Sequence, residues 1–322
     1  MNRMKIALLE PLNVPSSLIE ELAQPIKDAG HELTYYEEKT TDLEELKKRS
    51  QDVDIVMIAN NPYPGEVIES AQQLEFINVA FTGFDHVDVQ TAEAHNIKIA
   101  NAAGYSDDAV AELVIGLSLD VYRKISEGNQ EIRLAEDFSK PFQGRQIKGK
   151  TVGIIGTGKI GSQTARLFHA FGADILAYNR SEKEELKDLG VTYVDLDELM
   201  AESDIISLHL PNNEETKGLI SKEKIALMKE DAIFINCARG PIVDNDALAQ
   251  ALNEEKIAGA GIDVFDMEPP IPADYPLLKA KNAVLTPHVA FLTDEAMVAR
   301  AHIAFENTTA YLEGRPKNIV VD

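Results

Sequence analysis

The sequence predicts an α/β protein made of two doubly wound parallel-sheet domains. Short apolar runs alternate with amphipathic stretches over the first hundred residues, the alternation restarts at Thr151, and a glycine-rich turn lies early in the second series. A chain of 322 residues is long enough to bury two separate cores. These features indicate two successive domains with the same α/β architecture.

The first series contains five expected strands, which read MKIALLE, ELTYY, DIVMIA, EFINVA and IKIAN. Between them, SLIEELAQPIKDAG and TDLEELKKRS carry apolar residues every three or four positions, as amphipathic helices do. Pro25 lies inside the first of these segments and weakens the expectation of one unbroken helix.

A long helical stretch is expected from Ser106 to about Gly128, as the bridge between the domains. The second series follows it with strands expected in TVGIIG, DILAYN, VTYVD, DIISLHL, AIFINCA, AGAGIDVF and NAVLTPH. A last helix is predicted from about Thr293 to Glu313, and the tail KNIVV is predicted to return to the first domain.

The domain boundaries follow from this order of elements. We expect a discontinuous, flavodoxin-like substrate domain over residues 1–102 plus 292–322, and a Rossmann dinucleotide-binding domain over residues 103–291. The cleft between two such domains is the expected ligand site.

Composition excludes several classes of partner. A net charge of −23 disfavours nucleic acid and anionic membranes, so any pocket for an acid must carry its own cations. The single cysteine and the early Pro11 predict a cytoplasmic protein without disulfides or a secretory leader, and no apolar run is long enough to span a membrane. No metal-ligand spacing is present, so no metal is expected.

A dinucleotide site is predicted at the strand-to-helix turn after TVGII. The turn consists of Gly156, Thr157, Gly158, Lys159, Ile160 and Gly161. In this context the glycines permit a tight turn, close approach of a pyrophosphate, and close helix–strand packing. The next strand ends at Asn179, followed by Arg180 and Ser181, where an enzyme specific for NAD would place an acidic residue. Together with Lys183, two residues further on, this neutral and basic cluster favours NADP, with NAD possible.

Three segments that end strands of the second sheet carry candidate catalytic residues. The segments are NCARGPIVD, GIDVFDMEPP and LTPHVAF. Reduction of a 2-keto acid needs a cation for the carboxylate, a proton donor, and a partner that orients the donor. Arg239, His288 and Glu268 are residues of those three types.

With these motifs in place, the chain resembles the D-isomer-specific 2-hydroxyacid dehydrogenase family, in its glyoxylate and hydroxypyruvate reductase-like branch. GFDHVDV, NAAGYSDDAVAE and SLHLP are similar to further family landmarks in the expected order, and the match runs over nearly the whole length. The resemblance implies a nicotinamide-dependent oxidoreductase acting on a small 2-keto or 2-hydroxy acid.

The resemblance also implies roles for individual residues. Arg239 and His288 would bind the substrate, with His288 as general acid and base and Glu268 as its orienting partner. Backbone N–H groups near Gly83 and Phe84 would complete the carboxylate site. The remaining residues expected around the cofactor are His209, Pro211, Cys237, Ala238 and Asp263. Of these, His209 is interpreted mainly as structural, and Cys237 as a small buried thiol.

The loop NNPYPGE, where relatives contact the variable part of the substrate, carries no Arg or Lys. This disfavours 3-phosphoglycerate and leaves glyoxylate, hydroxypyruvate, pyruvate or bulkier 2-keto acids. Tyr63, Tyr105 and Phe291 are candidates to line that pocket.

Other readings stay open at this point. A dinucleotide-sensing, corepressor-like interaction protein shares the fold, and phosphoglycerate dehydrogenase shares the chemistry. Formate dehydrogenase is a third alternative. Glu268 disfavours it, because a formate dehydrogenase is expected to use a different partner near the histidine. The helix from residue 106 and the FSKPFQGRQIKG arm resemble the dimer contact of the family, so a two-fold homodimer is predicted.

Overall fold

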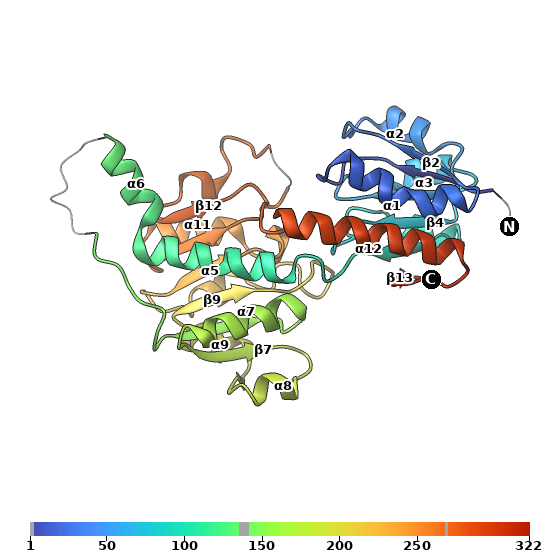
Figure 1. The fold of residues 1–322 in the computed structure, drawn as a ribbon. Coiled ribbons are helices and arrows are strands. Elements are labelled where there is room, and N and C mark those ends of the chain that lie inside the picture. Colours follow the sequence, from blue (N-terminus) through green and yellow to red (C-terminus); the bar gives the residue numbers. More distant parts are fainter. Residues whose placement is uncertain (1–2, 135–141, 268–269) are drawn as a thin grey trace. The chain divides into compact units, whose positions relative to one another are not determined.

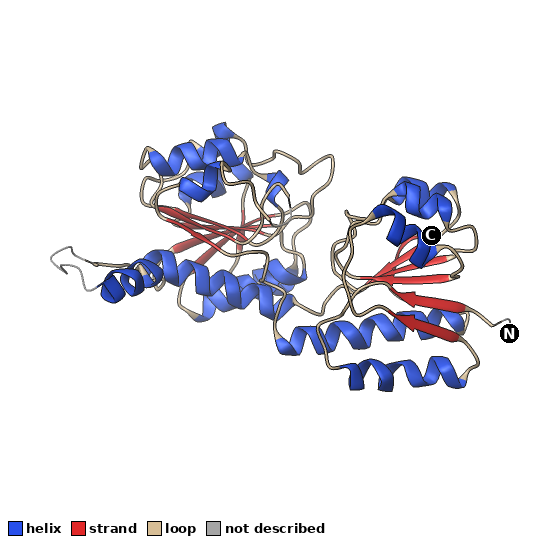
Figure 2. Cartoon of the chain, turned by 90° about the horizontal axis from the view of Figure 1, so that it is seen from above, coloured by secondary structure: helices blue, strands red, loops and turns tan. Residues whose placement is uncertain are grey.

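The computed structural model describes residues 3–134, 142–267 and 270–322 (Figure 1). The chain divides into two compact units: unit 1 comprises Met1–Ser106 and Leu292–Asp322, and unit 2 comprises Asp107–Phe291. Each unit is a sheet with helices on both sides (Figure 2). The predicted α/β class with parallel sheets is therefore confirmed.

Unit 1 is a six-stranded sheet in the order β13-β5-β4-β3-β1-β2. The strands are β1 (Lys5–Leu8), β2 (Glu32–Tyr35), β3 (Ile55–Ile58), β4 (Phe76–Val79), β5 (Lys98–Asn101) and β13 (Ile319–Val321). All pairs are parallel except β13 with β5. The tail thus returns to the first sheet as predicted.

The helices of unit 1 are α1 (Ser16–Asp28), α2 (Leu43–Ser50), α3 (Gly65–Ser70), α4 (Val89–Ala94) and α12 (Asp294–Leu312). Helices α1 and α12 pack against each other. Pro25 lies within α1 but near its end, and the helix continues through it. Helix α12 begins where predicted, because the Thr293 hydroxyl accepts a hydrogen bond from the N–H of Ala296 at 3.1 Å.

Unit 2 is a seven-stranded parallel sheet in the order β12-β11-β10-β9-β6-β7-β8. Its strands are β6 (Thr151–Ile155), β7 (Asp174–Tyr178), β8 (Thr192–Tyr193), β9 (Ile205–Leu208), β10 (Ile233–Asn236), β11 (Gly259–Ile262) and β12 (Ala283–Leu285). Its helices include α5 (Asp107–Arg123), α7 (Lys159–Ala170), α8 (Glu184–Lys187), α9 (Leu196–Glu202), α10 (Lys222–Ile225) and α11 (Asn245–Asn253).

The prediction of one helix ending near Gly128 is wrong. Helix α5 ends at Arg123, Lys124 adopts a left-handed backbone (φ 53°), and a second helix, α6 (Ile125–Leu134), contains Gly128. A left-handed residue breaks the i→i−4 ladder whatever its side chain. None of the residues of α6 is buried within the chain, and Figure 1 shows it continuing beyond α5.

Every residue of β3, β4, β9, β10 and β11 is buried, as expected where helices cover both faces of a parallel sheet. The parallel strands of each sheet end at the same edge, which is where open α/β sheets bind ligands. Among the described helices, none combines the length and apolar character that a bilayer crossing requires.

Candidate active site

The glycine-rich turn joins β6 to α7 as predicted. Gly156 has φ 95°, and a Cβ there would lie 2.7 Å from the His209 carbonyl oxygen, while a Cβ at Gly161 would overlap the Gly156 carbonyl. At Gly158, by contrast, a Cβ would meet nothing within 4 Å. Helix α7 begins at this open position without a side-chain cap. The turn therefore has the glycines and the uncapped helix start that a pyrophosphate group needs.

The end of β7 holds the predicted ribose-binding residues. The Asn179 side chain accepts a hydrogen bond from the N–H of Thr157 at 3.2 Å and donates one to the Ser181 carbonyl at 2.7 Å. Arg180 is exposed and lies 3.1 Å from Glu215. The amide of Asn179 thus joins this strand end to the glycine-rich turn.

Lys183 is the second cation of this predicted cluster. Lys183 Nζ donates to the Ser162 hydroxyl at 3.0 Å, and the Lys183 N–H donates to the Tyr193 hydroxyl, which itself bonds Thr157 Oγ1 at 3.2 Å. The lysine is therefore held beside the first turn of α7. Its position, five residues after the end of β7 at Tyr178, agrees with its place in the predicted cluster.

His209 and Cys237 lie at the ends of β9 and β10 and are unsuited to acid–base or nucleophilic work. The His209 ring shares a hydrogen bond of 2.8 Å with the Ser207 hydroxyl, and burial lowers its pKa to about 3, so the ring is neutral at pH 7. Burial also raises the pKa of the Cys237 thiol well above its usual value. Both findings agree with the structural roles expected for them.

Arg239 lies in a loop held by backbone and amide hydrogen bonds. Asn236, the last residue of β10, accepts from the N–H of Ala238 at 2.9 Å and donates to the Arg239 carbonyl at 3.0 Å. At Gly240 a Cβ would overlap the backbone of Phe265, so the loop packs directly against the segment after β11. The half-buried Arg239 side chain is thereby fixed at the carboxyl edge of the sheet.

Asp263 organises the segment that carries His288. Its side chain is fully buried and accepts hydrogen bonds from the Thr286 hydroxyl at 2.6 Å and from the N–H groups of Val289 and Ala290 at 2.9 Å each. Burial raises the pKa of this carboxyl, and these donors oppose the shift. Both carboxylate oxygens therefore serve the loop after β12.

His288 has a strained backbone within that loop. Its φ is 56°, which is uncommon for a residue with a side chain, and its N–H bonds the carbonyls of Asp263 at 2.9 Å and Thr286 at 3.1 Å. Its ring meets Phe291 edge-on at 5.4 Å. Strain of this kind persists where surrounding contacts enforce it, and it concentrates at functional sites.

The other predicted residues fall elsewhere. Gly83 and Phe84 follow β4 and belong to unit 1, whereas Arg239 and His288 belong to unit 2. Glu268 lies outside the described residues. Tyr63 does not fit the pocket-lining role, because its hydroxyl is already bonded to Ser50 at 2.9 Å.

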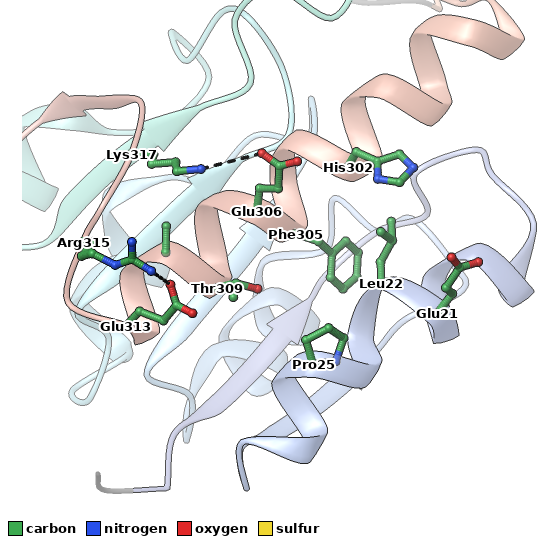
Figure 3. A pocket seen from close by; sticks show the side chains of 11 residues that line it. Glu21, Leu22, Pro25, His302, Phe305, Glu306, Thr309, Glu313, Arg315 and Lys317 are labelled. Carbon is green, nitrogen blue, oxygen red and sulfur yellow. Dashed lines mark hydrogen bonds and ion pairs between the residues drawn. The ribbon is translucent and has the colours of Figure 1, made fainter.

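A separate groove of about 450 Å³ lies in unit 1 between α1 and α12 (Figure 3). It is lined by Glu21, Leu22, Pro25, His302, Phe305, Glu306, Thr309, Ala310, Glu313, Arg315 and Lys317. Arg315 pairs with Glu313 at 2.6 Å, and Lys317 lies 4.0 Å from Glu306. Because its cations face carboxylates, this groove is poorly suited to an anionic substrate.

The fold and the strand ends of unit 2 define a class: an α/β oxidoreductase of the dinucleotide-binding type. Residues 115–290 match the model for "D-isomer specific 2-hydroxyacid dehydrogenase, NAD binding domain". The chain belongs to the D-isomer specific 2-hydroxyacid dehydrogenase family, whose members are nicotinamide-dependent oxidoreductases.

Two relatives and one solved structure show how close this membership is. A hydroxypyruvate reductase from Blautia hydrogenotrophica is 37% identical over 297 residues, covering 90% of this chain and 92% of the relative. A glyoxylate reductase from Thermofilum pendens is 39% identical over 279 residues, covering 84% and 82%. The structure of an acyclic imino acid reductase (Bsp5) in complex with NADPH and D-Arg has a TM-score of 0.87 and 32% identity, covering 98% of this chain and 100% of that one.

Proposed function

We propose that the protein reduces a small 2-keto acid, with glyoxylate and hydroxypyruvate as first candidates, to the D-2-hydroxy acid, using NADPH. The observation that carries the proposal is the arrangement at one edge of the unit 2 sheet. Arg239 follows β10 and His288 follows β12, and the loops of both are held in place by hydrogen bonds. The two similar reductases support the choice of acids.

Each residue would supply one requirement of the reaction. When bound, the nicotinamide supplies a hydride to the carbonyl carbon. Arg239 binds the substrate carboxylate through its planar fork and polarises the neighbouring carbonyl. His288 donates a proton to the carbonyl oxygen as that oxygen takes on negative charge, which gives the hydroxyl of the product.

Two acidic residues would support His288 in different ways. Glu268 is proposed to hold the imidazole ring, as the family resemblance implies. Asp263 was expected beside the nicotinamide amide. Its contacts support an additional duty, which is to fix the backbone at residues 286–290. A proton donor held this way loses little entropy on reaching its reactive position.

The preference for NADPH rests on the group after β7. Asn179 stands where a carboxylate would receive the ribose hydroxyls of NAD, and Arg180 and Lys183 offer positive charge for a 2′-phosphate. Lys183 is the better placed of the two, because Ser162 holds it beside α7 while Arg180 faces Glu215. The similar reductase bound to NADPH is consistent with this preference.

One observation favours a second candidate substrate. The loop NNPYPGE has no cation of its own, but Lys39 Nζ donates to the Asn60 side chain at 3.2 Å, which brings a positive charge to the loop. This was not visible in the sequence, since Lys39 and Asn60 are distant along the chain. A 3-phosphorylated 2-keto acid is therefore the alternative to test.

Initial rates decide the proposal. We would measure NADPH and NADH oxidation with glyoxylate, hydroxypyruvate, pyruvate, phenylpyruvate and 3-phosphohydroxypyruvate. Rapid oxidation of NADPH with glyoxylate or hydroxypyruvate is expected. Turnover only with the phosphorylated acid would favour the second candidate, and none with any acid would remove the proposal.

A homodimer is proposed through α6. Its side chains Ile125, Ile132 and Leu134 are 55%, 61% and 67% exposed. Apolar side chains that are exposed together on one element mark an interaction site. A second copy of the chain is the occupant implied by family resemblance. Sedimentation should give a dimer for the native chain and a monomer for Ile132→Asp, and a monomeric native chain would contradict this.

Two further expectations rest on composition. The net charge of −23 supports the absence of nucleic acid partners, and the single cysteine supports a cytoplasmic location. Both stay predictions.

A further inference from the structure

A buried carboxylate fixes the loop after β3 in unit 1. Glu10 is only 2% exposed, and its Oε1 accepts hydrogen bonds from the N–H of Ala59 at 2.7 Å and from that of Asn61 at 3.0 Å. Burial raises the pKa of Glu10, while these amides and the charges of Lys39 and Arg300 oppose the shift. The Glu10 carboxylate thus holds the backbone at the start of the loop NNPYPGE, which is expected to contact the variable part of the substrate.

A buried guanidinium lies close to Glu10. Arg300, from α12, is 2% exposed; its Nη2 donates to the Leu12 carbonyl at 2.7 Å, and its side chain also hydrogen-bonds Tyr105. Its Nε has no hydrogen-bond partner in the described part of the chain. A buried charged donor without a partner is costly and calls for a ligand or water.

Further unsatisfied polar atoms gather at the same edge of the sheet. Thr82 Oγ1 and Asn61 Oδ1 are buried and, among the residues described, have no partner. Tyr105 follows β5, and its ring lies 6.1 Å from that of Phe81, the residue before Thr82. The residues involved follow β1, β3, β4 and β5, whose carboxyl ends meet at one edge.

The position of Thr82 connects this group with the proposed substrate site. It directly precedes Gly83 and Phe84, whose N–H groups are proposed to bind the substrate carboxylate, and its carbonyl is held by the Asn101 side chain at 2.7 Å. Thr82 Oγ1 therefore belongs to the same strand-end loop as the groups proposed to bind the carboxylate. This neighbourhood makes a substituent on the carbon beyond the carbonyl the part of the substrate to consider for these polar atoms.

Building on the proposed function, we propose that Arg300, Tyr105 and Thr82 form a specificity subsite that binds a hydroxyl group on C3 of the 2-keto acid. A hydroxyl donates and accepts hydrogen bonds and carries no charge, so it suits a group in which Glu10 already balances Arg300. A phosphate would bring two negative charges beside Glu10, and a methyl group would leave the polar atoms unsatisfied. Hydroxypyruvate carries this hydroxyl group and fits the subsite. Pyruvate has a methyl group at C3 and glyoxylate has no C3, so neither of them fits it.

The test compares two substrates that differ only by this hydroxyl. We would measure kcat/KM for hydroxypyruvate and pyruvate with NADPH, in the native protein and in Tyr105→Phe and Thr82→Val. The native protein should favour hydroxypyruvate by at least about 10-fold, since a site built to hydrogen-bond a hydroxyl discriminates strongly against its absence. Tyr105→Phe should lower the hydroxypyruvate value about 10-fold and leave the pyruvate value nearly unchanged.

Tyr63→Phe is the matched control, because Tyr63 is a buried tyrosine of the same unit whose hydroxyl bonds Ser50. It should leave the ratio of the two values unchanged. A native ratio near one, or a ratio that Tyr105→Phe and Thr82→Val do not change, would overturn the subsite. Equal reduction of both acids rejects the subsite alone, whereas no reduction of any acid rejects the proposed function. Both test variants are near-isosteric, so a cofactor titration suffices to show that they are folded.

Discussion

Two regions differ in how completely their polar groups are satisfied: the loops that carry Arg239 and His288 in unit 2, and the loops around Asn61 and Thr82 in unit 1. In unit 2, Asp263 accepts three hydrogen bonds and Asn236 makes two, so the loops of His288 and Arg239 are fixed before any ligand arrives. In unit 1, Asn61, Thr82 and Arg300 each keep a buried polar atom without a partner in the described residues. If the proposed roles hold, the contrast teaches that a fixed reaction favours a rigid loop, whereas substrate choice can be left to groups that the substrate itself satisfies.

The largest effect is expected from removing His288, the proposed proton donor. His288→Ala should lower kcat with any accepted acid by about 10²–10⁴-fold, the usual worth of general acid catalysis. NADPH binding, followed by fluorescence titration, should be unchanged. His169→Ala, on the exposed end of α7, is the control and should keep the native rate. A native rate in His288→Ala would remove this residue from its role.

Loosening the same loop without touching the ring should have a smaller effect. Asp263→Asn places an amide against the N–H groups of Val289 and Ala290, so it should displace His288 and lower kcat by about 100-fold. Thr286→Val removes only one of the three hydrogen bonds and should cost less. Steady-state kinetics measures both, and an undiminished kcat in Asp263→Asn would show that the loop does not need this carboxylate.

The next prediction compares the two cations after β7 in unit 2 and their effects on cofactor preference. Lys183→Met should lower kcat/KM for NADPH by about 10-fold or more, which corresponds to one charge-assisted hydrogen bond, and leave the value for NADH nearly unchanged. Arg180→Gln should have a weaker effect, because Arg180 is exposed and faces Glu215. If the native protein used NADH as well as NADPH, the role of this cluster would be refuted.

A pH dependence of stability should arise from His209. The pKa of the histidine is about 3 in the folded chain and about 6.5 when unfolded, so between these values only the unfolded chain takes up the proton. The free energy of unfolding should therefore fall, by at most about 1.4 kcal/mol per pH unit from this group, as pH drops below about 6.5. Urea unfolding of the native chain and His209→Gln at several pH values measures it. The variant should show the shallower slope, and equal slopes would contradict the prediction.

Local patterns in the sequence were enough to predict much of this structure. The glycine-rich turn, the helix capped by Thr293 and the return of the tail to the first sheet each depend on short segments whose residues specify their own conformation. Arg239 and His288 were recognisable because each follows an apolar strand. Their positions at one edge then follow from the parallel order of the sheet.

What the sequence did not predict depends on long-range packing or on backbone strain. The electrostatic interaction of Glu10 with Arg300 joins residues near opposite ends of the chain, although an arginine on the buried face of a helix is a signal that could have been noticed. The left-handed backbone of Lys124 has no marker, and that of His288 has only a weak one, since histidine adopts this conformation more often than most residues with a side chain. Such conformations are imposed by neighbours, so they emerge only with the fold.

The most direct test of the central claim is the configuration of the product. Hydroxypyruvate would be reduced with excess NADPH, and the glycerate that forms would be resolved by chiral chromatography. A protein of this family, with His288 and Arg239 in the roles proposed, should give D-glycerate in step with NADPH consumption. L-glycerate, a racemic mixture, or no consumption of NADPH would contradict the account.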